Sequence, residues 1–242
     1  MSAWLDPLRA ALDAASSEVA FFFRDDDAGW RDDRLHRLLD VFEAAGAPID
    51  VAAIPSALAP ERARRLAGRC RAVPELIRVH QHGLAHTNHE PVGRKSEFGP
   101  SRRAHEQLAD VLLGRRLLLD RIGEVEPIFT PPWNRCTRDT ARAVRHAGLG
   151  VLSRDSSAEP FHLEGVRELP VSVDWVRLDR AELGCRLAAA VRRGKPTGVM
   201  LHHAVMDGED REGVARLLAL VQGSSAVRLA TMSDLAATEV AA

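Results

Sequence analysis

Short apolar runs alternate along the chain with longer segments in which apolar residues recur every three or four positions. The run at 18–24 ends in three consecutive phenylalanines, a pattern typical of a strand buried on both faces of a parallel sheet. The segment 31–45 has its leucines at helical spacing and is closed by Gly46. Further strands are predicted at 49–54, 76–82, 128–130, 149–153, 168–173, 198–201 and 227–230. Further helices are predicted at 61–68, 101–121, 137–147, 181–193, 211–222 and 233–239.

This alternation predicts an α/β fold with a parallel sheet covered by helices on both faces. The right-handed crossover rule allows an open doubly wound sheet or a closed barrel. Polar clusters follow directly after several strands, where the sites of barrels gather, so a barrel is favoured and an open sheet is the alternative. No low-complexity segment, long linker or repeat divides the sequence, so residues 1–242 are predicted to form a single domain.

Composition narrows the classes of partner. Lys and Arg number 33 against 34 Asp and Glu, so the net charge of −1 gives no reason to expect a nucleic-acid partner. No apolar stretch approaches the ~18 residues that a membrane span needs. The first residues lack the pattern of a cleavable signal, and the cysteines (Cys70, Cys136 and Cys185) form no metal or disulfide motif. A cytoplasmic enzyme is expected, and the sequence does not indicate an oligomeric state.

The first polar cluster is 24–30, Arg-Asp-Asp-Asp-Ala-Gly-Trp, at the end of the phenylalanine strand. Adjacent carboxylates at a buried strand end are costly unless a cation or a proton compensates them. Neighbouring side chains on a strand point to opposite faces, so two of them can share one site only if a turn begins near Ala28 and Gly29. A solvated acidic turn that caps the next helix is the alternative.

The second cluster is the segment 80–89, which holds four of the ten histidines of the chain. His82 and His86 are four residues apart, a spacing at which both imidazoles can reach one ion. Two histidines and one carboxylate with an open position for water form a common hydrolytic metal site. A histidine-rich surface loop is the alternative.

Three more clusters follow later strands: 129–135 with two prolines, 173–175 with Asp174, and 199–203 with two histidines at its end. Tryptophans lie beside three of the clusters, at Trp30, Trp133 and Trp175. Aromatic faces pack on the apolar faces of sugar rings and acyl groups, so these tryptophans indicate a carbohydrate-like ligand.

In this order, the motifs resemble those of the polysaccharide deacetylases (NodB homology, carbohydrate esterase family 4). The likeness runs from about Phe21 to His203 and includes an Asp-Asp strand end, a His-x-x-x-His loop, an Asp-Trp pair and a Leu-His strand end. The chain is similar to divergent intracellular members in having Arg-x-Asp-Asp and His-Gly-x-x-His. The resemblance implies a distorted (β/α)7-type barrel.

The resemblance also implies residue roles. Asp26 would be the catalytic base and His202 the catalytic acid, with Asp174 supporting them. The implied ligands of Zn²⁺, or of another divalent metal such as Co²⁺, Ni²⁺ or Mn²⁺, are Asp27, His82 and His86. The expected substrate-binding residues are Trp30, Pro132, Trp133, Asn134, Arg135, Trp175 and His203. Spacing alone does not choose between His202 and His203 as the acid, and the register of the resemblance favours His202.

The chain departs from the family pattern in two places. Arg24-Asp25 stands where the family has Thr-Phe, and the segment 130–133 lacks the arginine of an Arg-x-Pro-Tyr motif. Arg135 could reach a similar place, and the sequence does not decide whether it replaces that arginine. The predicted activity is a metal-dependent hydrolase that removes an acetyl group from an N-acetylated sugar or polysaccharide. The alternatives are an amidase or esterase acting on another acylated small molecule, and an inactive sugar-binding homologue.

Overall fold

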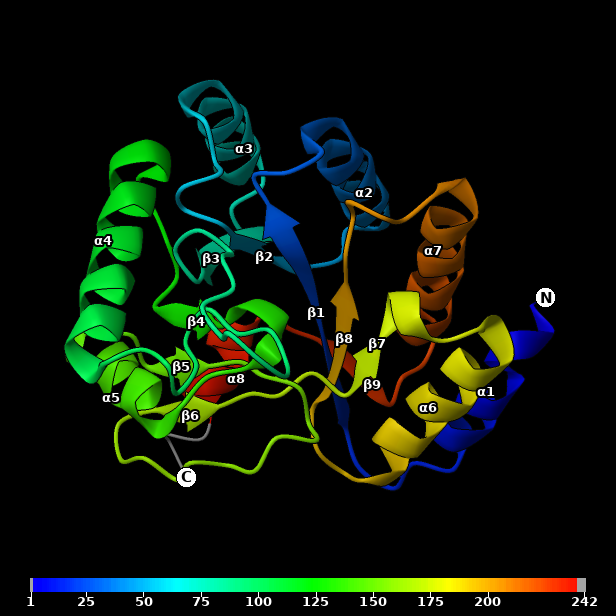
Figure 1. Cartoon of the computed structure of the whole chain (residues 1–242). Helices are drawn as coiled ribbons and strands as arrows, with labels where there is room; N and C mark the ends of the chain where they lie inside the picture. The colour runs from blue at the N-terminus through cyan, green and yellow to red at the C-terminus, as the bar shows by residue number, and fades with distance from the viewer. Residues whose placement is uncertain (1, 239–242) are drawn as a thin grey trace.

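The structure, a computed structural model, describes residues 2–238, and within them nine parallel strands form one curled sheet (Figure 1). The strand order is β6-β5-β4-β3-β2-β1-β8-β7, and β9 pairs with the start of β1. The strands are β1 (Val19–Ala28), β2 (Ile49–Ala53), β3 (Ile77–His82), β4 (Ile128–Thr130), β5 (Val151–Leu152), β6 (Arg167–Glu168), β7 (Val173–Asp174), β8 (Thr197–Leu201) and β9 (Val227–Leu229). This is the expected distorted barrel, with β1 as its central strand.

The helices cover the outside of the curled sheet, as Figure 1 shows for α2, α3, α4 and α7. They are α1 (Asp6–Asp13), α2 (Asp32–Ala45), α3 (Pro60–Ala72), α4 (Ala104–Ile122), α5 (Arg138–His146), α6 (Arg180–Arg192), α7 (Gly208–Gln222) and α8 (Met232–Thr238). The last residue of the predicted helix 233–239 lies outside the described residues. Among the helices of residues 2–238, none has the length and apolar character needed to cross a membrane.

One predicted strand is wrong. The segment 168–173 is not one strand but the connection between β6 and β7, the two edges of the sheet path. Pro170 lies in the middle of this segment and has no N–H to donate to a neighbouring strand. After it, Val171 donates to the carbonyl of Arg154 at 2.8 Å and Ser172 donates to that of Gly198 at 2.7 Å. The segment between β6 and β7 therefore passes from the β5 side of the sheet to β8 and connects the two ends of the strand order.

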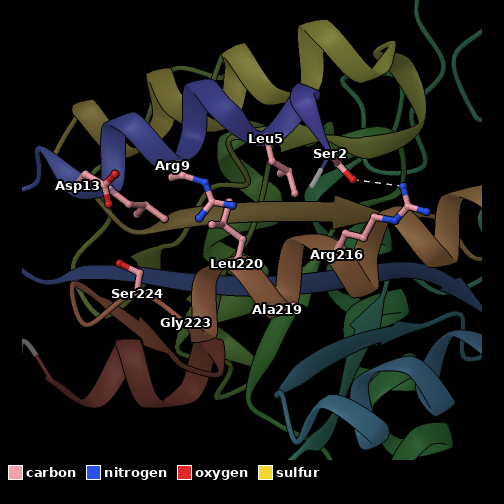
Figure 2. Close-up of a pocket in the computed structure, with 10 residues that line it drawn as sticks. Ser2, Leu5, Arg9, Asp13, Arg216, Ala219, Leu220, Gly223 and Ser224 are labelled. Atoms are coloured by element: carbon pink, nitrogen blue, oxygen red, sulfur yellow. Dashed lines mark hydrogen bonds between the residues drawn. The ribbon is translucent and has the colours of Figure 1, made fainter.

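Helix α1 has no counterpart among the predicted elements. Pro7 stands in its first turn, where its missing N–H costs nothing, and Leu8 and Leu12 are buried in the core. It packs against α6. Figure 2 shows the groove of about 630 Å³ that α1 forms with α7, lined by residues such as Leu5, Arg9 and Arg216. None of the expected site residues lines this groove.

Side chains on β1 alternate between two cores. Phe21 and Phe23 belong to the cluster packed under the helices. Phe22 belongs to the cluster inside the barrel, with Met200 of β8 and Met232 of α8. Arg24 and Asp26 follow Phe22 at steps of two and therefore face the barrel interior, toward the carboxyl ends of the strands.

Asp50 of β2 is a buried carboxyl group inside the barrel. It is fully buried, its Oδ2 accepts the backbone N–H of Met232 at 2.9 Å, and its Oδ1 has no partner among the described residues. Burial raises the pKa of Asp50 from 3.8 to about 8. The folded protein therefore holds a proton on this residue at neutral pH.

We expect the free energy of unfolding to fall as the pH rises from 3.8 to about 8, because the unfolded chain releases the proton that folded Asp50 retains. The loss is on the order of 1.4 kcal/mol per pH unit at most. Asp50→Asn should remove this dependence, with little change near pH 4 and a gain in stability at pH 8. Urea unfolding of both proteins across this range measures it. Parallel losses of stability in both proteins would show that the proton is not on Asp50.

Candidate metal centre and catalytic site

The structure brings Asp27, His82 and His86 together at the carboxyl ends of β1 and β3. The Nε2 atoms of His82 and His86 each lie 3.3 Å from Asp27 Oδ1. One ligand atom from each of the three residues lies within 4.8 Å of the other two. Residues more than fifty positions apart in sequence thus converge on one point, as the sequence predicted.

Asp26 and Asp27 serve one site because the end of β1 is irregular. The register of β1 against β2 shifts between Asp25 and Ala28, and Asp27 has a φ of 73°. A left-handed residue breaks the strand alternation, so the side chains of Asp26 and Asp27 are no longer forced to opposite faces. The turn follows at Gly29, where the sequence placed it.

The loop from His82 to His86 is held by a buried carboxylate. Glu97, 1% exposed, accepts the backbone N–H groups of Leu84 and Ala85 at 3.2 and 2.7 Å. Gly83 has a φ of 60°, and a Cβ there would lie 2.1 Å from Glu97 Oε2 and 2.7 Å from Pro132. Only glycine fits this close approach, and the fixed loop then delivers His86 to the site.

The polar atoms of this trio suit a divalent cation. His82 Nδ1 lies 3.0 Å from the carbonyl of Thr130, which only accepts, so Nδ1 carries a hydrogen and Nε2 is the nitrogen that faces Asp27. Burial lowers the pKa of His82, but the contact with Asp27 and the charges of Asp26 and Asp27 outweigh burial and raise it, so a bound cation would take the place of a proton at Nε2. Burial, followed by the charge of His82, lowers the pKa of His86 and favours its neutral form. Asp27 Oδ1 is buried without a hydrogen-bond partner in the described chain. Two imidazole nitrogens around an unpartnered carboxylate oxygen fit Zn²⁺ or a similar ion.

A buried arginine holds Asp26. Arg24 is 0% exposed, and its Nε and Nη2 donate to Asp26 Oδ1 and Oδ2 at 2.8 and 2.9 Å. Burial alone would raise the pKa of Asp26, but the charges of Arg24, His82 and His202 outweigh it and hold the pKa at about 2. Asp26 is therefore ionised and fixed in orientation by a two-point contact.

Arg24 is in turn held on all sides. It donates to Ser153 Oγ at 2.8 Å and to Asn134 Oδ1 at 2.7 Å, and its Nη2 lies 3.0 Å from Met200 Sδ. Sequence reasoning noted Arg24 as a departure from the family pattern and as part of an Arg-x-Asp-Asp motif, but gave it no role in the site. The signal was available: an arginine two positions before Asp26 on a strand lies on the same face of the sheet.

Arg135, which the sequence left open as a replacement for the missing family arginine, contacts another segment of the chain. Its Nη1 donates to the carbonyl of Lys95 at 2.8 Å, and its own carbonyl accepts from Ser96 Oγ at 3.2 Å. Asp26 is instead bound by Arg24, which is two residues away on the same strand and already points at it. The neighbouring Asn134 takes part in the site, because its amide joins Arg24.

His202 and Asp174 lie where the sequence placed them, at the ends of β8 and β7. Asp174 is in register with Met200, whose sulfur touches Arg24, and its Oδ1 accepts the N–H of Val176 at 3.3 Å. Burial raises the pKa of Asp174, against the opposing charges of His202 and Arg177. Nδ1 of His202 is buried and has no partner among the described residues. A half-buried imidazole thus lies near both Asp174 and Asp26.

His203, expected among the substrate-binding residues, is instead buried and held by contacts within the protein. It is buried, its Nδ1 donates to Asp25 Oδ2 at 2.6 Å, and its Nε2 donates to the carbonyl of Trp30 at 2.8 Å. Burial lowers its pKa, but Asp25 outweighs burial and raises the pKa to about 9. His203 is therefore a cation that ties β8 to the end of β1, and its burial leaves His202 as the histidine at the site.

Trp175 does not line the site either. It is 1% exposed, its ring packs edge-on against Trp4 at 5.9 Å between centroids, and its Nε1 donates to Asp210 Oδ1 at 3.1 Å. The residue before it, Asp174, faces the barrel interior, so the alternation along the chain sends Trp175 to the helix side.

Trp30 and Trp133 flank His86. Their ring centroids lie 4.9 and 4.3 Å from that of His86. Trp133 is at a φ of 56° beyond buried Pro132, a conformation that turns the ring toward His86 rather than along the strand. Trp30 is 38% exposed, so these two rings form the accessible aromatic edge of the site.

Comparisons of sequence and of fold give different results. No protein-family model matches the chain, and no curated protein matches its sequence. Solved structures do match. One is a protein from Mycobacterium smegmatis assigned as a polysaccharide deacetylase, with a TM-score of 0.73 and 16% identity over 92% of this chain and 90% of that one.

Two further structures of carbohydrate esterase family 4 are similar. The family 4 acetyl xylan esterase from Clostridium thermocellum, solved with a cobalt ion, has a TM-score of 0.60 and 12% identity over 89% of both chains. A family 4 pseudoenzyme from Bacillus anthracis has a TM-score of 0.60 and 13% identity over 91% of this chain and 66% of that one. At these identities the likeness shows the fold, and this fold is the one expected from the motifs.

Proposed function

We propose that this protein is a metal-dependent hydrolase of the polysaccharide deacetylase family that removes an acetyl group from an N-acetylated sugar or polysaccharide. The observation that carries the proposal is the convergence of Asp27, His82 and His86, with the ion-paired Asp26 next to them. The fold supports it, since an esterase with this fold was solved with a cobalt ion.

Asp27, His82 and His86 would hold the metal, and Zn²⁺ or another divalent ion fits their donor set. When bound, such an ion lowers the pKa of a coordinated water from near 16 toward ~7 and polarises the carbonyl of the substrate. Within the chain, Glu97 fixes the loop that carries His86, and the carbonyl of Thr130 fixes the tautomer of His82.

In the proposed reaction Asp26 accepts the proton of the attacking water. Arg24 contacts each carboxylate oxygen once, which leaves a lone pair on each for the proton. His202 then gives a proton to the leaving amine, and the nearby Asp174 carboxylate interacts with it electrostatically. A backbone N–H of the segment Pro132–Asn134 would donate to the oxyanion.

The site also bears on the alternative of an inactive homologue, which the similar pseudoenzyme and the absent motif arginine suggest. Arg24 gives Asp26 the guanidinium partner that the third motif lacks. This favours an active enzyme. An amidase or esterase acting on a non-carbohydrate substrate would use the same residues and differs only in what the rim of the site binds.

We expect the metal-loaded protein to release acetate from N-acetylated oligosaccharides, and a chelator to abolish the release until Zn²⁺ or Co²⁺ is restored. Acetate release should be compared on N-acetylated glycans, simple acetamides and acetyl esters. Acetate from acetamides or esters but not from glycans would overturn the carbohydrate assignment. No acetate from any compound by a protein shown to hold one metal would overturn the enzyme assignment.

A further inference from the structure

The two residues that stand in place of the family's Thr-Phe before Asp26 each have a buried partner. Arg24 binds Asp26, and Asp25 binds His203. The reaction proposed above gives no role to Asp25 or His203. Both side chains are fully buried, and the strand alternation turns Asp25 to the face of β1 opposite Arg24 and Asp26. The Asp25–His203 pair therefore lies behind the site rather than on a surface that meets the substrate.

Asp25 holds the chain directly after His202 at two points. Its Oδ1 accepts the backbone N–H of His203 at 2.9 Å, and its Oδ2 accepts Nδ1–H of the same residue at 2.6 Å. That backbone N–H belongs to the rigid peptide plane that joins His202 to His203. On the other side of His202, Leu201 is in register with Asp25 in the ladder of β1 and β8. The backbone is thus fixed to β1 on both sides of His202.

The imidazole of His203 extends this contact to the loop that follows β1. Its Nε2 donates to the carbonyl of Trp30 at 2.8 Å. From α2, Nη1 of Arg34 donates to the carbonyls of Ala204 and Met206 at 2.9 and 3.4 Å, which holds the same turn after β8. Charge-assisted hydrogen bonds such as that between the His203 ring and its carboxylate partner are short and strong. The ends of β1 and β8 are therefore locked together.

We propose that Asp25 and His203 are positioning residues for proton transfer, which hold His202 at the place from which it protonates the leaving amine. The inference rests on the proposed function for the roles of Asp26 and His202. Asp26 follows Asp25 by one residue and His202 precedes His203 by one residue, so the pair sets the spacing of base and acid. A displacement of about 1 Å at a reacting group can cost about 10²-fold in turnover.

The test compares an amide and an ester that differ in their need for an acid. The amine of an N-acetylated oligosaccharide must be protonated as it leaves, whereas the 4-nitrophenolate of 4-nitrophenyl acetate leaves as a stable anion. His203→Phe keeps the bulk of the ring but removes both of its N–H donors. We expect it to lower kcat for the amide by about 10- to 100-fold. The KM, the metal content and the turnover of the ester should change little.

Further variants show whether His203 acts through His202. In His202→Ala the acid is absent, so adding His203→Phe should cause no further loss of amide turnover. Asp25→Asn keeps an acceptor for the N–H of His203 and a donor for its Nδ1, and should retain most of the amide turnover. If His203→Phe does not fold, His203→Gln, which keeps one N–H donor, takes its place with a smaller expected loss.

His36→Phe is the matched control, because His36 of α2 is also a buried histidine beside a carboxylate, 3.6 Å from Asp32 Oδ1. It should leave the ratio of amide to ester turnover unchanged. Equal losses for the two compounds in His203→Phe, loss of its metal, or additive losses with His202→Ala would overturn the inference and leave the proposed function intact. No acetate from either compound by the metal-loaded wild type would overturn the proposed function and this inference with it.

Discussion

His82→Ala is expected to remove the bound metal and, with it, all measurable acetate release. Nε2 of His82 is one of two imidazole nitrogens 3.3 Å from the unpartnered Asp27 Oδ1, and a three-ligand site that loses one nitrogen donor binds a divalent ion far more weakly. Metal content of the purified protein measures the first effect. For the wild type we expect one ion per chain.

Stability gives a second measure that does not depend on turnover. An ion that binds the folded state at a hundredfold excess over its dissociation constant stabilises by about 2.7 kcal/mol. Adding Zn²⁺ to chelator-treated protein should therefore raise the free energy of unfolding of the wild type but not of His82→Ala. Comparing each protein with and without the ion removes any intrinsic cost of the substitution from the result.

His89→Ala is the matched control for this experiment. His89 lies in the same histidine-rich segment but is exposed, and its contact with Ser96 is made by the backbone N–H. We expect this variant to keep its metal, its metal-dependent stability and its activity. If His89→Ala lost the ion as His82→Ala does, the site would be a general property of the loop and the assigned ligands would be wrong.

The sequence predicts that Asp27, His82 and His86 lie together, because the signal is local. A strand-end carboxylate and two histidines four positions apart need only the rule that the carboxyl ends of parallel strands meet at one mouth. The same rule places Asp174 and His202 correctly. What fails are predictions about where individual side chains point beyond a strand end. His203 and Trp175 each follow a site residue by one position, but they lie beyond the strands, in a turn and in a short 3-10 helix, and both are buried away from the site.

Tertiary contacts decide the remaining differences. Arg135 is the arginine nearest in sequence to the missing motif position, but its side chain contacts Lys95. Arg24 contacts Asp26 instead, because residues two positions apart on one strand lie side by side on the same face. The division of 168–173 into two strands depends on which neighbours are available on either side of Pro170. The Arg-x-Asp spacing on a strand signals the first of these facts, whereas the second is not contained in residue type or spacing alone.

The buried Arg24–Asp26 pair should show strong coupling between its two residues. Asp26→Asn is expected to lower turnover by about 10²–10⁴-fold, as for loss of a general base, with the metal retained. Arg24→Leu leaves the Asp26 carboxylate buried without its partner and should cost about 3–5 kcal/mol of stability. The double variant removes both charges, so its loss of stability should be smaller than the sum of the two single losses.

The exposed pair Arg142–Asp139 on α5 is the control for this cycle. It has the same chemistry at 2.7 Å, but its side chains are 60% and 45% exposed, so its coupling should stay below about 1 kcal/mol. Urea unfolding of both sets of variants, with metal content and acetate release measured on each, completes the test. Full additivity in the Arg24–Asp26 cycle would mean that the two residues act independently. Unchanged turnover in Asp26→Asn would remove Asp26 as the base, and the proton would then have to pass to another group beside the metal ligands.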